Sequence, residues 1–203
     1  MRRIPKQARS KAKVETIIRA AADQLRQGGY EGLSTAGVAN QAGVSVGTLY
    51  QFFDNKDDLM QAIAEEHLIK METFRTELYG PDAIYVPPDI LLGRTIDWLI
   101  NHSVQHPTFN QIFGGNWHDP TLHATLEGTL GAIIADLVHI IRHHAPEISP
   151  DRAQTGAGVL VYIIKGMLGL LEATEPTTHA ASITEIKTMS LLYFYNLVGG
   201  PQP

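Results

Sequence analysis

The sequence predicts an all-α protein of about nine helices. Along most of its 203 residues, apolar side chains recur at spacings of three and four, with little of the alternation that is typical of strands. Three predicted helices also carry a proline in their first turn, where its missing N–H costs no hydrogen bond: Pro120, Pro150 and Pro176. With 44% hydrophobic and 18% charged residues, the composition is that of a folded chain.

Each predicted helix has a recognisable start or end. The first, 12–27, is stopped by Gly28 and Gly29, and the long helix 55–79 begins after Asn55, a favoured N-cap residue. The remaining helices are predicted at 34–41, 45–52, 88–105, 107–113, 120–145, 150–173 and 177–198.

The chain contains no cysteine. This excludes disulfide frameworks, thiolate zinc sites, iron–sulfur clusters and cysteine nucleophiles. It also suits a reducing cytoplasm, where we expect the protein to act. We expect no membrane partner, because no uninterrupted apolar run approaches the roughly 20 residues of a membrane span. The basic start is not followed by an apolar segment, so we expect no secretory signal there.

Positive charge is concentrated at the beginning of the sequence. Residues 2–13 contain six Lys and Arg and no acid, although the formal net charge of the chain is −5. Residues 1–60 contain nine Lys and Arg against six Asp and Glu, whereas residues 61–203 contain seven against fifteen. This asymmetry indicates contact with a polyanion at one end only, and the alternative is a solvated basic tail.

The segment 34–59, STAGVANQAGVSVGTLYQFFDNKDDL, has the spacing of a helix-turn-helix. Gly43 allows a tight turn, and Val44 can pack between the two short helices. The second helix opens with the small or polar side chains of residues 45–48, so its N-terminus can approach a DNA groove. Tyr50 and Lys56 follow, and both can reach phosphate oxygens.

The stretch AGVSVGTLYQFFDNKDDL, with IIRAAADQLRQGGY upstream, resembles the DNA-binding domain of the TetR family of bacterial transcriptional regulators. The resemblance covers residues 14–60, and residues 61–203 agree only in helix number and length. It implies a homodimer in which a helix-turn-helix domain, residues 1–54, binds double-stranded operator DNA. Residues 55–203 would form a connecting helix and a helical ligand-binding and dimerisation domain. The implied activity is repression that a small apolar or aromatic effector relieves.

The resemblance also implies residue roles at the DNA. Thr35, Tyr50 and Lys56 would contact phosphates, while the start of the recognition helix would face base edges. Ser45 could instead serve only as the helix N-cap, and Tyr50 could be a packing residue. Together with the basic arm, the predicted DNA contacts are Arg2, Arg3, Lys6, Thr35, Ser45, Val46, Thr48, Tyr50 and Lys56. Gly37, inside the second predicted helix, departs from the family pattern. A glycine at such a position costs roughly 1 kcal/mol of helix stability relative to alanine.

The last two helices have broad apolar surfaces. Residues 159–171 read VLVYIIKGMLGLL, which is apolar all round and indicates burial on more than one side. We expect one face to join the core and another to meet a second subunit. The predicted interface residues are Ile163, Gly166, Leu170, Ile186, Tyr193 and Leu197.

Aromatic residues cluster in the middle of the chain. They favour a pocket for an apolar, partly aromatic ligand, and the alternative is an ordinary helical core. The predicted lining is Trp98, His102, Phe109, Phe113, Trp117, Leu122, Leu126, Leu130 and Tyr162.

Three functions compete with that of a ligand-responsive regulator. A divalent-metal sensor could use the pairs His102/His106 and His139/His143, four residues apart, but no cysteine or HExxH motif completes a site. We therefore expect no metal site and no cofactor, and we expect His67 to be a hydrogen-bonded core histidine. An enzyme is not expected, because no nucleophile elbow or phosphate-binding loop is present. A DNA-binding regulator without a ligand remains an alternative.

Overall fold

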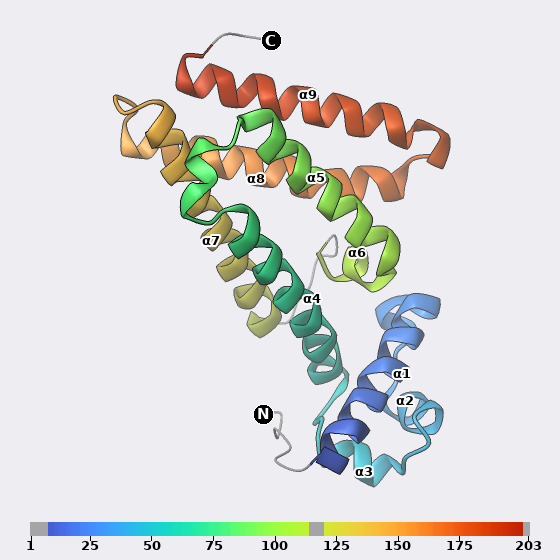
Figure 1. Ribbon diagram of the computed structural model, residues 1–203. Helices are drawn as coiled ribbons and strands as arrows, with labels where there is room; N and C mark the ends of the chain where they lie inside the picture. The colour runs from blue at the N-terminus through green and yellow to red at the C-terminus, as the bar shows by residue number, and fades with distance from the viewer. Residues whose placement is uncertain (1–7, 114–119, 201–203) are drawn as a thin grey trace.

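The computed structural model describes residues 8–113 and 120–200, and within these residues it has nine α-helices, two 3₁₀ helices and no strand (Figure 1). The all-α prediction is confirmed. The helices are α1 (Ala8–Gly32), α2 (Thr35–Gln41), α3 (Val46–Tyr50), α4 (Lys56–Leu78), α5 (Pro88–Gln105), α6 (Pro107–Phe113), α7 (Pro120–His144), α8 (Pro150–Ala173) and α9 (His179–Val198), with 3₁₀ helices η1 (Pro81–Tyr85) and η2 (Pro176–Thr178).

Local capping explains why several helices begin where they do. The side chains of Ser34, Ser45 and Asn55 each accept a hydrogen bond from a backbone N–H three residues later, at 3.1, 3.1 and 2.9 Å. Helix α1 changes direction at Gly29, whose φ of 61° lies in the left-handed region that favours glycine. The predicted stop at Gly28 and Gly29 is therefore a kink, after which a short helical piece continues to Gly32.

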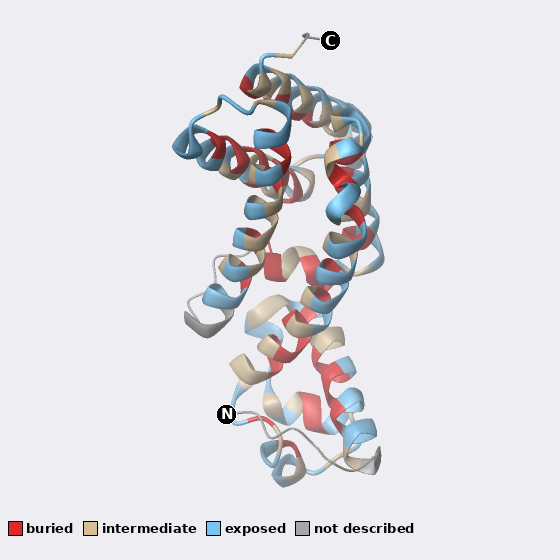
Figure 2. Ribbon diagram, turned by 60° about the vertical axis from the view of Figure 1, so that its left-hand side comes forward, coloured by how far each residue is buried: buried red, intermediate tan, exposed pale blue. Residues whose placement is uncertain are grey.

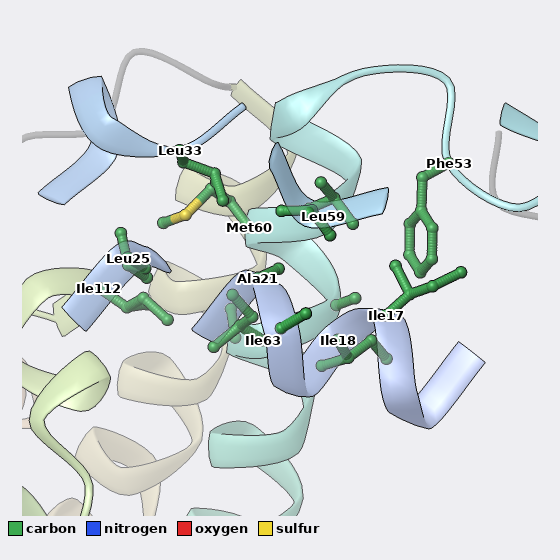
Figure 3. Packing of buried hydrophobic residues seen from close by; sticks show 14 of the residues in the cluster. Ile17, Ile18, Ala21, Leu25, Leu33, Phe53, Leu59, Met60, Ile63 and Ile112 are labelled. Atoms are coloured by element: carbon green, nitrogen blue, oxygen red, sulfur yellow. The ribbon is translucent and has the colours of Figure 1, made fainter. Parts of the chain in front are cut away.

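The N-terminal core joins α1, α2 and α3 to the first half of α4. Ile17, Leu25, Phe53 and Leu59 are fully buried within it (Figure 3). Helix α6 belongs to the same core although the whole of α5 separates it from α4 in the chain: Ile112 is fully buried beside Leu25 and Ile63 (Figure 3). The N-terminal helices and the rest of the molecule therefore share one hydrophobic cluster, which links their positions.

The C-terminal core is formed by α5, α7, α8 and α9. Helices α8 and α9 lie side by side at the end of the molecule opposite α3 (Figure 1). Buried residues concentrate on the inner faces of the helices, and the outer faces are largely exposed (Figure 2). Helix α4 runs between the two halves, with Met60 in the N-terminal core and Leu78 in the C-terminal core.

Helices α7 and α8 contain long, mostly apolar stretches. His123–His144 and Pro150–Leu171 are long and apolar enough to cross a membrane by length and composition alone, although charged residues interrupt both, as expected from the sequence. Core helices of soluble proteins pass the same test, and both helices contribute fully buried residues such as Ile141 and Leu160 to the C-terminal core.

Candidate nucleic-acid interface and ligand cavity

The exposed start of α3 forms the candidate DNA-reading surface. Val46 and Tyr50 are 43% and 49% exposed although both are large, so neither is needed for the domain core. Ser45 caps the helix through the N–H of Thr48, and its Oγ also lies 2.9 Å from the Thr48 hydroxyl. The capping role of Ser45 is thus present in the structure, and Ser45, like Val46, is exposed.

Two predicted phosphate contacts lie side by side. The hydroxyls of Thr35, at the start of α2, and Tyr50, at the end of α3, are 3.2 Å apart and both are accessible. Two adjacent hydroxyls can donate to one phosphate group. The structure therefore brings together residues that are 15 positions apart in sequence.

Lys56, the first residue of α4, is held by a residue that sequence reasoning missed. Its Nζ lies 3.7 Å from the ring centroid of Tyr30, a cation–π contact, while the Tyr30 phenol hydrogen-bonds to Asp57. The only signal in the sequence that could have identified Tyr30 is its place at the end of the upstream motif. The predicted arm residues Arg2, Arg3 and Lys6 lie outside the described residues.

A largely apolar cavity lies between α4, α5, α6, α7 and α8. The cavity and its opening to solvent together contain about 700 Å³ of empty space. Within this space, only about 70 Å³ can be occupied by the centre of a water molecule. A drug-sized ligand would therefore have to move side chains. The walls are Met71, Phe74, Arg75, Tyr79, Thr95, Trp98, Leu99, Phe109, Phe113, Leu130, Ile133, Leu137, Val161, Ile164, Lys165 and Leu168.

Four of the nine predicted pocket residues line this cavity: Trp98, Phe109, Phe113 and Leu130. His102 lies just behind the wall, stacked on the Trp98 ring at 4.7 Å. Leu126 is buried in the N-terminal core and is not part of the lining. Trp117 lies outside the described residues, as does the side chain of Leu122.

Tyr162 does not line the cavity, which corrects its predicted role. On α8 the wall is formed by Val161, Ile164, Lys165 and Leu168, whose spacing follows one helix face. Tyr162 is turned about 100° away from Val161, is 48% exposed, and donates to Glu127 at 2.9 Å.

The polar groups of the cavity wall are mostly engaged with each other. Arg75 donates to Glu72 at 2.7 and 2.8 Å and also to Asp136 on α7, so two carboxylates neutralise it and raise its pKa. Thr95 donates its hydroxyl hydrogen to Leu91, so the hydrogen bond of 2.7 Å from Tyr79 must be donated by the phenol. Burial raises the pKa of Tyr79 to about 12, which keeps the phenol neutral.

Behind Trp98 lies a buried cluster of histidines. His67 Nδ1 is 3.2 Å from His102 Nε2, and His67 Nε2 is 3.0 Å from the Thr108 hydroxyl, so each His67 nitrogen has a partner. The expectation of a hydrogen-bonded core histidine is confirmed. Burial, then the neighbouring histidines His102 and His106, then Lys70, lower the pKa of His67 to about 3. Burial, followed by His106 and Lys70, lowers the pKa of His102 to about 4.

The two predicted histidine pairs lie in different environments. His106 joins the buried cluster and accepts a hydrogen bond from Lys70 at 3.1 Å, whereas His139 and His143 are exposed on α7. Within the described part of the chain, no group of three His, Cys, Asp or Glu side chains has an arrangement that could hold a metal ion.

The predicted dimer residues divide between two environments. Gly166 and Leu170 are exposed, and Ile163 and Tyr193 are half-buried. Ile186 and Leu197 are each only 6% exposed and pack inside the subunit, which corrects their assignment. Large apolar residues that remain exposed on α8 and α9 are Val159, Tyr162, Leu170, Met189 and Leu192.

Two family models match the sequence. Residues 17–63 match the bacterial regulatory proteins of the tetR family, and residues 87–193 match the tetracyclin repressor-like C-terminal domain. A similar curated protein is the uncharacterised HTH-type transcriptional regulator YvdT of Bacillus subtilis, 31% identical over 93 residues. That match covers 45% of this chain and about half, 47%, of the relative.

Solved structures share the fold along nearly the whole chain. A transcriptional regulator from Rhodococcus sp. Rha1 has a TM-score of 0.73 at 19% identity, over 90% of this chain and 95% of that one. The regulator FadR from Bacillus subtilis, in complex with stearoyl-CoA, has a TM-score of 0.67 at 15% identity, over 93% and 99% of the two chains.

Proposed function

Because this chain belongs to the TetR family of DNA-binding transcriptional regulators, we propose that it is a cytoplasmic repressor that releases a near-palindromic operator when a small, largely apolar molecule enters its cavity. The observation that carries the proposal is the double role of α6. Phe109 and Phe113 form part of the cavity wall and are also buried in the core that holds α1 and α4.

The DNA-binding role is assigned to the exposed surface of α2 and α3. Val46 and Thr48 would read base edges, while the hydroxyls of Thr35 and Tyr50 and the ammonium of Lys56 would hold phosphates. The basic arm, residues 2–13, would add further contacts with the DNA backbone.

We assign dimerisation to the exposed apolar faces of α8 and α9. Val159, Gly166 and Leu170 on α8, with Met189 and Leu192 on α9, provide an apolar surface that a second copy would cover. Two copies would present two recognition helices about 34 Å apart, the spacing of one turn of DNA.

Ligand binding and DNA binding would be coupled through α4 and α6. Entry of a ligand between Trp98, Phe109 and Phe113 requires side chains to move, and α6 cannot shift without changing its packing on α1 and α4. Because α3 and α4 are separated only by residues 51–55, a shift of α4 would change the distance between the two recognition helices of the dimer. A coupling free energy of about 1–3 kcal/mol would change operator affinity by about 5- to 150-fold.

The test combines ligand binding with operator release. A panel of water-soluble apolar acids, alcohols and aromatic compounds is screened for a concentration-dependent rise in melting temperature. We expect the stabilising compounds to weaken operator binding, measured by fluorescence anisotropy. Trp98→Ala should lose most of this response and keep ligand-free operator affinity, while Tyr85→Ala, an exposed aromatic control, should behave like the wild type. Compounds that bind the cavity but leave operator affinity unchanged would refute the proposal.

A further inference from the structure

We propose that the effector is an amphipathic anion whose apolar body fills the cavity and whose carboxylate or phosphate is held by Lys165. This inference rests on the proposed function, because it names the chemistry of the molecule that enters the same cavity. The three observations behind it are the apolar wall, the pairing of Arg75, and the absence of an acidic partner for Lys165 among the described residues.

The cavity wall selects for an apolar body. Almost all of its exposed surface comes from carbon atoms, with Phe74 stacked on Trp98 at 4.6 Å and Phe109 stacked on Phe113 at 4.3 Å. Its polar members, Tyr79 and Thr95, are bonded to each other and to the backbone. A ligand with several buried polar groups would lose hydration without finding partners, which is costly.

Two cations contribute to the wall, and only one of them is available. Arg75 lies between Glu72 and Asp136, so its charge is already neutralised by two carboxylates. Lys165 is half-buried and forms no ion pair within the described residues. Its Nζ lies 5.7 Å from the ring centroid of Tyr162, which is 48% exposed, so the stem of the lysine lines the cavity while its ammonium lies toward solvent.

This arrangement matches the two ends of an amphipathic anion. The apolar body would displace water from the aromatic wall, and the charged end would stay at the partly hydrated edge of the cavity beside the ammonium.

The test compares probes that differ only at the charged end. Nonanoate, octyl phosphate and octan-1-ol, which share an eight-carbon alkyl chain, are titrated at pH 7.5 in a Trp117→Phe background, so that Trp98 is the only tryptophan and its fluorescence reports entry. We expect at least one of the two anions to bind at least tenfold more tightly than the alcohol, and comparison of the two identifies the preferred group. In Lys165→Met the affinities for that anion and the alcohol should fall within about twofold of each other. Lys165→Arg should retain the preference, as should Lys187→Met, whose lysine pairs with Asp97 and is not part of the lining.

The possible failures are distinguishable. If the alcohol binds the wild type as tightly as both anions, the apolar site stands and the anionic subsite is refuted. If an anion is preferred equally in the wild type and in Lys165→Met, the charge is held elsewhere and the assignment of Lys165 is wrong. If none of the probes changes the fluorescence of Trp98, both this inference and the proposed ligand cavity fail.

Discussion

Acidification should destabilise this protein through its buried histidines. Neither His67, 5% exposed, nor His102, 7% exposed, can be protonated without placing a charge in the core. Their pKa values in the folded state are lowered to about 3 and about 4, against about 6.5 in an unfolded chain. Between these values the unfolded state binds more protons than the folded state, so stability is complete above pH 6.5 and falls as the pH falls toward 4.

The size of the effect follows from the pKa difference. At pH 5 an unfolded histidine is almost fully protonated, whereas His67 and His102 remain mostly neutral in the fold. Lowering the pH from 7.5 to 5 then costs about 2 kcal/mol for each histidine, or about 4 kcal/mol for the pair. That is a large part of the typical stability of a domain.

Guanidinium unfolding followed by circular dichroism measures this loss. The titration is repeated from pH 7.5 to pH 5 at one protein concentration, because dimer formation makes stability concentration-dependent. The double variant His67→Gln/His102→Gln should lose about 4 kcal/mol of the pH dependence, whatever its stability at pH 7.5. His139→Gln, which alters an exposed histidine on α7, should keep the wild-type dependence. If the double variant and the wild type show equal pH dependence, the buried cluster does not carry the effect.

Three further predictions concern DNA and assembly. Lys56→Ala should weaken binding to all DNA sequences alike, whereas Val46→Thr should change which bases are preferred. Selection from a degenerate operator library measures both effects, and a changed base preference in Lys56→Ala would contradict the phosphate role of Lys56. Deleting residues 2–13 should flatten the log–log salt dependence of binding by about 0.9 for each phosphate that the arm neutralises, and an unchanged slope would make the arm a passive tail. Met189→Glu should convert dimers to monomers or to insoluble protein in sedimentation experiments, and wild-type protein that is monomeric at micromolar concentration would refute the interface.

The helices could be predicted from the sequence because their ends depend on local chemistry. Ser45 and Asn55 cap α3 and α4 through neighbouring N–H groups, and prolines begin α7 and α8, so all four starts depend on nearby residues. Gly37 lowers the helix propensity of α2, but it also has a role in packing. A Cβ at that position would lie 2.8 Å from the amide nitrogen of Gln24 and from the Ser34 hydroxyl, so α2 packs closely against α1 there.

The cavity and the dimer face were predicted less well because they depend on how the helices pack. Aromatic residues such as Trp98 indicated the right region, yet Tyr162 was placed one position off the face that α8 presents. Helix α9 is apolar on most of its surface, so its pattern could not separate the buried Ile186 from the exposed Met189.

The sequence around each histidine gave even less information about the buried histidine cluster. His67 and Thr108 are 41 positions apart and meet only because α6 packs against α4. Sequence reasoning placed His67 in the core from the apolar residues around it, but its partners became identifiable only in three dimensions.

Selection of bound DNA from a random double-stranded library tests the central conclusion most directly. The full-length protein is incubated with the library at moderate salt, and the bound molecules are sequenced after several rounds. For a symmetric dimer with one α3 from each subunit, we predict an enriched near-palindrome whose half-sites are about one helical turn, roughly 34 Å, apart. Enrichment should disappear in the Lys56→Ala/Tyr50→Phe variant, which removes two of the phosphate contacts assigned to each subunit. Absence of enrichment with the wild type, or a site without a repeated half, would contradict the assignment of α2 and α3 as a paired DNA-reading surface.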